Sequence, residues 1–168
     1  MKLSIIVKAA AALVAGIFIT FSQVHDANLA MSGFAIIASG WFIAASISAL
    51  RKQNPILSVV VIVASALMVR FATSFDANNA TTMAWVLLEA WAIFVALIEI
   101  ISALRATKKS SARRDHLISA GLAAGLFVSQ ILITAASDSV SHVGFLGAYA
   151  IILGVHLGIT SASPKEKA

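Results

Sequence analysis

The sequence predicts an all-α membrane protein with six transmembrane helices arranged as three parallel-repeat helical hairpins. The first observation is composition: 60% of the 168 residues are hydrophobic, 11% are charged, and mean hydropathy is +0.97. A soluble domain of this size needs far more polar surface. The second is six apolar runs, each near the roughly 20 residues that a helix needs to cross a bilayer. Backbone groups in lipid must be hydrogen-bonded within their own segment, which favours helices.

The six runs set the domain organisation. In order, they cover residues 3–22, 30–50, 56–75, 83–104, 117–136 and 141–161. All connections are short, so we expect one transmembrane domain over 1–168, with hairpins at 3–50, 56–104 and 117–161, a basic loop at 105–116 and a tail at 162–168. The first run resembles a signal peptide, but Lys8 interrupts it and no A-x-A-like cleavage site follows, so we expect an uncleaved helix.

Basic residues give the third observation, because they occur at the N-terminus, in alternate loops and in the tail. They are Lys2, Arg51, Lys52, Arg105, Lys108, Lys109, Arg113, Arg114, Lys165 and Lys167. Positive residues stay cytoplasmic, so we expect a multi-pass protein of the bacterial plasma (inner) membrane with both termini in the cytoplasm. The net charge of +5 is then a topology signal rather than a sign of a nucleic-acid partner. The lipid bilayer is the expected partner, and the basic loop could contact anionic headgroups.

Short repeats support the hairpin arrangement. "FSQVHDANLA" (21–30) matches "FATSFDANNA" (71–80), and "ISALRK" (47–52) matches "ISALRA" (101–106). A weaker third copy passes through Asp138. Because every repeat begins on the cytoplasmic side, the repeats are parallel and related by an axis along the membrane normal. Short outer turns would make the two helices of each hairpin antiparallel neighbours.

Two glutamates, Glu89 and Glu99, lie within the fourth apolar run. At helical spacing the two glutamates lie on one face of the helix together with small residues, namely Ala92, Ala96 and Ala103. The opposite face carries bulky residues and is expected to meet lipid; these are Leu87, Trp91, Phe94, Ile98 and Ile101. Charged groups at membrane depth normally face protein. Depth predicts that Glu89 pairs with Arg70, and Glu99 with Lys8 or His156. The two levels are about 15 Å apart, which excludes a shared carboxylate dyad.

Two functions are consistent with these pairs. Neutralised pairs can hold helix register, or the carboxylates can relay protons or ions. We favour the first, because transporters use broken helices and the two prolines, Pro55 and Pro164, lie outside the expected helices. A small transporter or proton-conducting protein using Glu89, Glu99 and His156 stays as the alternative. A lipophilic-ligand-binding or accessory-subunit protein is a second alternative, suggested by the tryptophans Trp41, Trp85 and Trp91.

The expected outer loops carry acidic residues and histidines, namely His25, Asp26, Asp76, Asp138 and His142. Their spacing matches no zinc pattern, and Asp-Ala-Asn turns use these side chains for local backbone hydrogen bonds. Gln130 is expected to form a hydrogen bond between helices. The chain has no cysteine and contains no nucleophile elbow, metalloprotease motif or phosphate loop. We therefore expect a protein that is not an enzyme, without catalytic residues, metal or cofactor.

The runs "AWAIFVALIEIISALRA" and "GFLGAYAIILGVHLGITSASPK" resemble the HdeD-like family of small bacterial inner-membrane proteins. The family's even-numbered helices read aromatic-Ala-Ile, a small residue, Glu-Ile and Ala-x-x-Arg. The matching positions are Trp91, Ala92, Ile93, Ala96, Glu99, Ile100, Ala103 and Arg105, followed in the last hairpin by Gly147, Ala148, Tyr149 and Gly154. Ala96 stands where the family usually has glycine, and the first hairpin lacks the glutamate.

The resemblance covers the whole chain in topology and short runs in residues. It implies six helices in three hairpin repeats, an association with acid-stress resistance in some members, no defined reaction and no catalytic residues. We therefore expect a non-enzymatic membrane protein of HdeD-like type with a structural, assembly or stress role. A homo-oligomer and a larger membrane complex both remain open as its assembly.

Overall fold

Six helices make up the protein in the computed structural model, which describes residues 2–74, 77–134 and 139–163. They are α1 (Lys2–Phe21), α2 (Ala27–Leu50), α3 (Pro55–Thr73), α4 (Ala77–Arg105), α5 (Ser111–Thr134) and α6 (Ser139–Ala162). All six are long and apolar enough to cross a membrane. The described ranges contain no strand. The predicted six-helix membrane protein is therefore confirmed.

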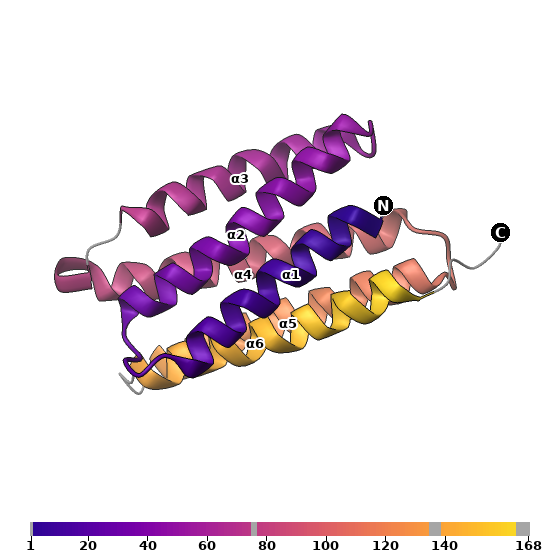
Figure 1. The fold of residues 1–168 in the computed structure, drawn as a ribbon. Coiled ribbons are helices and arrows are strands. Elements are labelled where there is room, and N and C mark those ends of the chain that lie inside the picture. Colours follow the sequence, from indigo (N-terminus) through magenta and orange to yellow (C-terminus); the bar gives the residue numbers. More distant parts are fainter. Residues whose placement is uncertain (1, 75–76, 135–138, 164–168) are drawn as a thin grey trace.

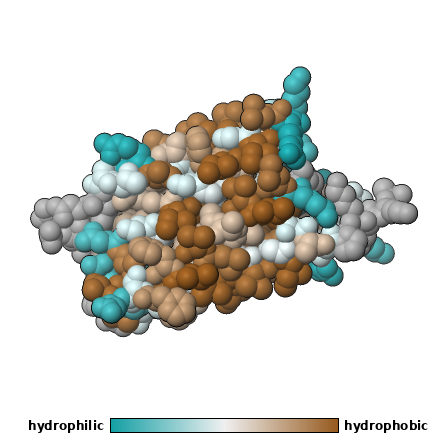
Figure 2. Space-filling view, in the orientation of Figure 1, coloured by the Kyte–Doolittle hydropathy of each residue, from teal (hydrophilic) through white to brown (hydrophobic). Residues whose placement is uncertain are grey.

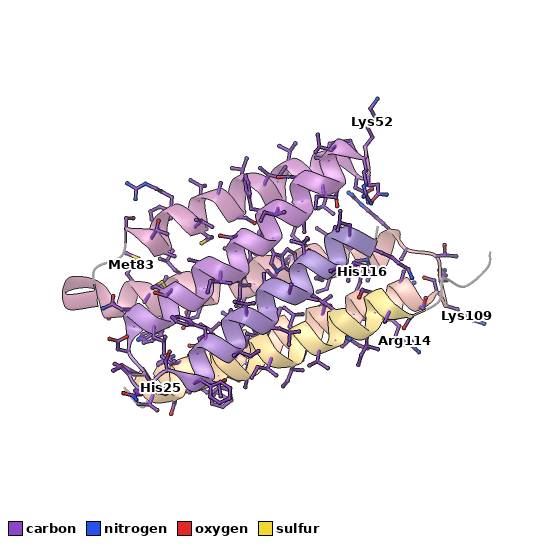
Figure 3. The ribbon with its side chains drawn as sticks, in the orientation of Figure 1. His25, Lys52, Met83, Lys109, Arg114 and His116 are labelled. Carbon is purple, nitrogen blue, oxygen red and sulfur yellow. The ribbon has the colours of Figure 1, made fainter. Side chains whose placement is uncertain are left out.

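The helices run side by side (Figure 1). Lys52, Lys109 and Arg114 lie at the end where α1 begins, which we call the basic end, and His25 lies at the opposite end (Figure 3). Between them, the face seen in Figure 2 is mostly hydrophobic. Many large apolar side chains point outward from the helices, as expected where the solvent is lipid. The chain is a multi-pass membrane protein.

Helix pairing differs from three equal hairpins. The most extensive contacts join α1 to α6, α4 to α5, α2 to α3 and α1 to α2, whereas α3 and α4 meet at few positions. The expectation that residues 56–104 form a packed hairpin is therefore wrong. The turn at the basic end, where Lys52 and Asn54 have φ angles of 53° and 48°, folds α3 back onto α2. The buried residues of α3 form one narrow seam of mostly small side chains, Ser58, Val61, Ser65 and Ala72.

The basic loop is shorter than predicted. Ser110 Oγ accepts a hydrogen bond from the Arg113 backbone N–H at 3.2 Å, which is the bond expected of an N-cap serine. Helix α5 consequently begins at Ser111 rather than at residue 117, and the expected loop at 105–116 is wrong in its second half. This change places His116 on the helix, where its side chain can reach the interior.

Glycines set the close contact between α1 and α6. A Cβ atom built on Gly16 would lie 2.9 Å from the backbone nitrogen of Ile151, and one on Gly154 would lie 2.9 Å from the backbone nitrogen of Leu13. Both distances are shorter than a carbon side chain tolerates. Helices in lipid associate through such close backbone approach at small residues, so these glycines position the first helix against the last.

We expect Gly16→Ala to lower the free energy of unfolding by about 1–3 kcal/mol, because the added methyl group overpacks the seam against a backbone. Gly121→Ala is the matched control on α5, where an added Cβ meets nothing within 4 Å. That change should be neutral or stabilising by up to about 1 kcal/mol, because glycine weakens a helix relative to alanine. Denaturation in detergent micelles, followed by circular dichroism, measures both. Equal losses in the two variants would contradict this packing.

Candidate functional site: a buried charge cluster around Glu99

Glu99 is the centre of a charge cluster built from three helices. Its side chain, on α4, is 6% exposed. Lys8 Nζ, from α1, lies 3.4 Å from Glu99 Oε1. His116 Nδ1, from α5, lies 2.6 Å from Glu99 Oε2. Each carboxylate oxygen therefore has a nitrogen partner from a different helix, and the predicted pairing of Lys8 with Glu99 is confirmed.

The small face of α4 brings Glu99 into the interior. Ala92, Ala96 and Ala103, which share that face, are all buried. The opposite face is not the uniform lipid face that the sequence suggested, because Trp91 and Ile98 are also buried. Helix α4 contacts α2, α3 and α5, so it is surrounded by protein over more of its circumference than a two-faced helix would be.

Lys8 has a second partner besides the carboxylate. Its ammonium lies over the ring of Trp41, on α2, 3.4 Å from the ring centroid. An ammonium at that distance is attracted by the negative face of the indole, and the attraction grows where water is excluded. The cluster thus engages α2 as well as α1, α4 and α5, and it neutralises a lysine that sits well inside an apolar helix.

Glu99 was expected to pair with Lys8 or with His156, and the second alternative does not form, because His156 Nε2 lies 3.1 Å from the backbone carbonyl oxygen of Asp115. Arg70 was expected beside Glu89, but its side chain is exposed on α3. The ion pairs of Lys8 and His116 are both with Glu99. The physical reason is that α3 packs against α2 instead of against α4, which carries Arg70 away from Glu89.

His116 is the residue that the sequence interpretation missed. The expected loop at 105–116 ended at His116, so no partner inside the bundle was predicted for this residue. The signal available in the sequence was Ser110, a good N-cap residue followed by helix-compatible residues. A helix starting there turns His116 toward α4.

A second buried polar cluster lies toward the opposite end. Gln130 Nε2, on α5, donates to the backbone carbonyl of His142, on α6, at 3.2 Å, and Gln130 Oε1 lies 2.5 Å from His142 Nδ1. Trp85, on α4, stacks on the His142 ring at 4.3 Å between centroids. The hydrogen bond between helices predicted for Gln130 is confirmed. The placement of His142 in a loop is wrong, because α6 begins at Ser139 and buries it.

Among the predicted turn residues that the structure describes, Asp26 makes a hydrogen bond to the nearby backbone. Asp26 caps α2, and its Oδ1 accepts from the Leu29 backbone N–H at 2.8 Å, which confirms the predicted turn role. His25 lies beside it at the opposite end (Figure 3). Asp76 and Asp138 lie outside the described residues. Within residues 2–74, 77–134 and 139–163, no group of three or more His, Cys, Asp or Glu side chains is placed to hold a metal ion.

The chemistry available in the Glu99 cluster is charge pairing and proton exchange. A carboxylate and an imidazole in direct contact can share a proton, and the neighbouring ammonium favours the ionised carboxylate.

Comparison of the chain with protein-family models, curated proteins and solved structures gives no match.

Proposed function

We propose that this chain is a non-enzymatic integral membrane protein of HdeD-like type, in which the contacts of the Glu99 cluster hold the helices in register. The observation that carries the proposal is the full occupancy of the Glu99 carboxylate. Both oxygens have a nitrogen partner, at 3.4 and 2.6 Å, and the partners come from the first and fifth helices. A carboxylate held in this way fixes the register of three helices.

The energetics of buried charge support a structural role. Removing one partner of a buried ion pair leaves an uncompensated charge and costs about 3–5 kcal/mol. In lipid, where apolar side chains gain little from leaving the solvent, polar contacts and close packing have to specify which helices associate. The cluster specifies contacts between helices that are distant in the sequence.

The HdeD-like assignment is supported by the role of one residue. Glu99 belongs to the run "EIISALR" that carries the resemblance, and the same side chain is the hub of the cluster. The basic end would lie in the cytoplasm of a bacterial plasma membrane under the positive-inside rule. A stress-associated, acid-resistance role then follows from the resemblance, in a homo-oligomer or a larger membrane complex.

Survival of an acid shock tests this role. We expect a bacterial strain lacking the protein to survive less well than the parent, and the wild-type chain to restore survival. The Glu99→Gln variant should restore survival less well, in proportion to the loss of folded protein from the membrane, because the Glu99 cluster acts by stabilising the fold. Immunoblotting of membrane fractions supplies the protein level. Equal survival of the parent and the deleted strain would contradict the stress role, whatever the stability of the variants.

A further inference from the structure

Five basic side chains gather where α4 ends and α5 begins, and we call them the loop cation cluster. Its members are Arg105, Lys108, Lys109, Arg113 and Arg114. Four of the five side chains are exposed, and that of Arg113 is partly buried. Lys109 and Arg114 mark the place of the cluster at the basic end in Figure 3. The only acidic residue in the same stretch is Asp115, so residues 105–116 carry a net charge of +4.

The two helix ends place the three arginines of the cluster near one another. Arg105 is the last residue of α4, and Arg113 and Arg114 lie in the first turn of α5. The two helices pack against each other extensively, and the axes of packed helices are about 8–10 Å apart. A guanidinium binds a phosphate group with two parallel hydrogen bonds. Because α5 begins at Ser111, these arginines are held on helices at neighbouring ends and can approach one phosphate from two sides.

Exposed leucines on both helices place the loop cation cluster at the level of lipid headgroups. Leu104, directly before Arg105, is 70% exposed, and Leu117, three residues after Arg114, is 49% exposed. Exposed leucines in the membrane-spanning part of a helix face acyl chains, which are as apolar as leucine itself. Arginine side chains near a helix end extend away from the acyl chains toward the membrane surface. The phosphate group that the arginines meet at this depth is therefore that of a lipid.

We propose that the loop cation cluster is a binding site for an anionic phospholipid, with the phosphate held between Arg105 of α4 and Arg113 and Arg114 of α5. The ligand is a phosphodiester with net negative charge, and its acyl chains lie along the exposed leucines. A lipid that bridges the two helix ends also favours the contact between α4 and α5. That contact includes the pair of Glu99 and His116, so this consequence rests on the function proposed for the Glu99 cluster.

The variant Arg113→Gln combined with Arg114→Gln removes two cations from the site. Each Lys or Arg near an anionic membrane surface strengthens binding roughly fivefold, so this double variant should bind phosphatidylglycerol about thirtyfold more weakly. Arg105→Gln alone should weaken binding about fivefold. It changes an exposed side chain and tests the site on the other helix, so it keeps the test decisive if the double variant does not fold.

The matched control is Arg51→Gln combined with Lys52→Gln, which removes the same charge from the turn between α2 and α3. This turn is also at the basic end, but Lys52 lies apart from Lys109 and Arg114 (Figure 3). Salt at about 0.15 M screens charges that are more than about 8 Å apart. The control should therefore bind phosphatidylglycerol within about threefold of wild type.

Native mass spectrometry of the full chain, titrated in micelles with phosphatidylglycerol or phosphatidylcholine, gives the dissociation constant for each lipid. We expect wild type and the control to prefer phosphatidylglycerol, and the Arg113→Gln, Arg114→Gln variant to lose this preference. Equal affinity of wild type for the two lipids would overturn the proposal. Unchanged affinity in the arginine variants would overturn it too. Equal losses in the two double variants would assign the attraction to the whole basic end and would also overturn it.

Thermal unfolding separates the lipid site from the role of Glu99. Phosphatidylglycerol at about a hundred times its dissociation constant should raise the unfolding temperature of wild type by several degrees. Glu99→Gln should unfold at a lower temperature but bind the lipid with wild-type affinity, because it keeps all three arginines. If Glu99→Gln were as stable as wild type, the function proposed for the Glu99 cluster would fail and the lipid site would stand. If the lipid did not raise the unfolding temperature of wild type, the lipid site would be overturned.

Discussion

Glu99→Gln is expected to lower the free energy of unfolding by about 3–5 kcal/mol, the cost of removing one partner from a buried ion pair. The amide keeps the shape of the side chain but cannot balance the Lys8 ammonium, which is 22% exposed and has no other carboxylate in the described part of the chain within ion-pair distance. The contact between this side chain and His116 Nδ1, which is 2.6 Å in the wild type, also loses the contribution of the carboxylate charge, because an amide is neutral. Equilibrium unfolding in mixed detergent micelles measures the loss.

Arg70→Gln is the matched control for that experiment. Arg70 is a charged residue inside an apolar helix, like Lys8, but its side chain is exposed on α3 and is not part of the Glu99 cluster. Its replacement should change the free energy of unfolding by no more than about 0.5 kcal/mol, as for most surface substitutions. Losses of the same size in both variants would mean that any charge change in these helices destabilises the protein, and the cluster would have no special role.

Trp91→Ala is expected to cost about 3–5 kcal/mol, the range for truncating a large buried aromatic residue. Trp91 is 1% exposed and packs edge-on against Phe34 and Trp41, with centroid distances of 5.6 and 5.9 Å. The truncation therefore removes a wall of the Trp41 pocket, and Trp41 is the ring on which Lys8 rests. The loss should appear as a lower midpoint in thermal unfolding followed by tryptophan fluorescence or circular dichroism.

Two control variants show whether the loss of stability in Trp91→Ala comes from the buried ring. Trp91→Phe keeps a ring in the cavity and loses no hydrogen bond, because the indole nitrogen has no partner, so its cost should be clearly smaller. Phe21→Ala removes an aromatic ring that is 81% exposed and should change stability by about 0.5 kcal/mol or less. If Trp91→Ala were as mild as Phe21→Ala, the aromatic cluster would not be part of the packed core.

Helices were predictable from the sequence, and their pairing was not. Runs of apolar residues near bilayer length identify all six helices, because lipid leaves the backbone no other choice. The same runs do not say which helices touch. The repeats suggested that α3 pairs with α4, but the tight turn after α2 and the narrow seam of α3 decide that α3 packs on α2. Such seams are only a few small residues wide, and small residues are common throughout these helices.

Of the contacts in the Glu99 cluster, the one with Lys8 was predictable from the sequence, and those with His116 and Trp41 were not. Depth along the helix placed Lys8 level with Glu99, and a buried carboxylate needs a cation, so the pair could be inferred. His116 was missed because the polar first turns of α5 look like a loop when hydropathy alone is considered. The contact between Lys8 and Trp41 depends on the rotation of α2 about its axis. The near-even apolar distribution of α2 gives little sign of that rotation.

A double-mutant cycle on Lys8 and Glu99 tests the central claim most directly. The free energies of unfolding of wild type, Lys8→Met, Glu99→Gln and the double variant give the coupling between the two side chains. We expect a coupling of about 1–3 kcal/mol, with the double variant less destabilised than the sum of the single ones. If the double variant lost the sum of the two single losses of unfolding free energy, within about 0.5 kcal/mol, the two side chains would not act as a pair. That result would contradict the role of the Glu99 cluster in holding the helices together.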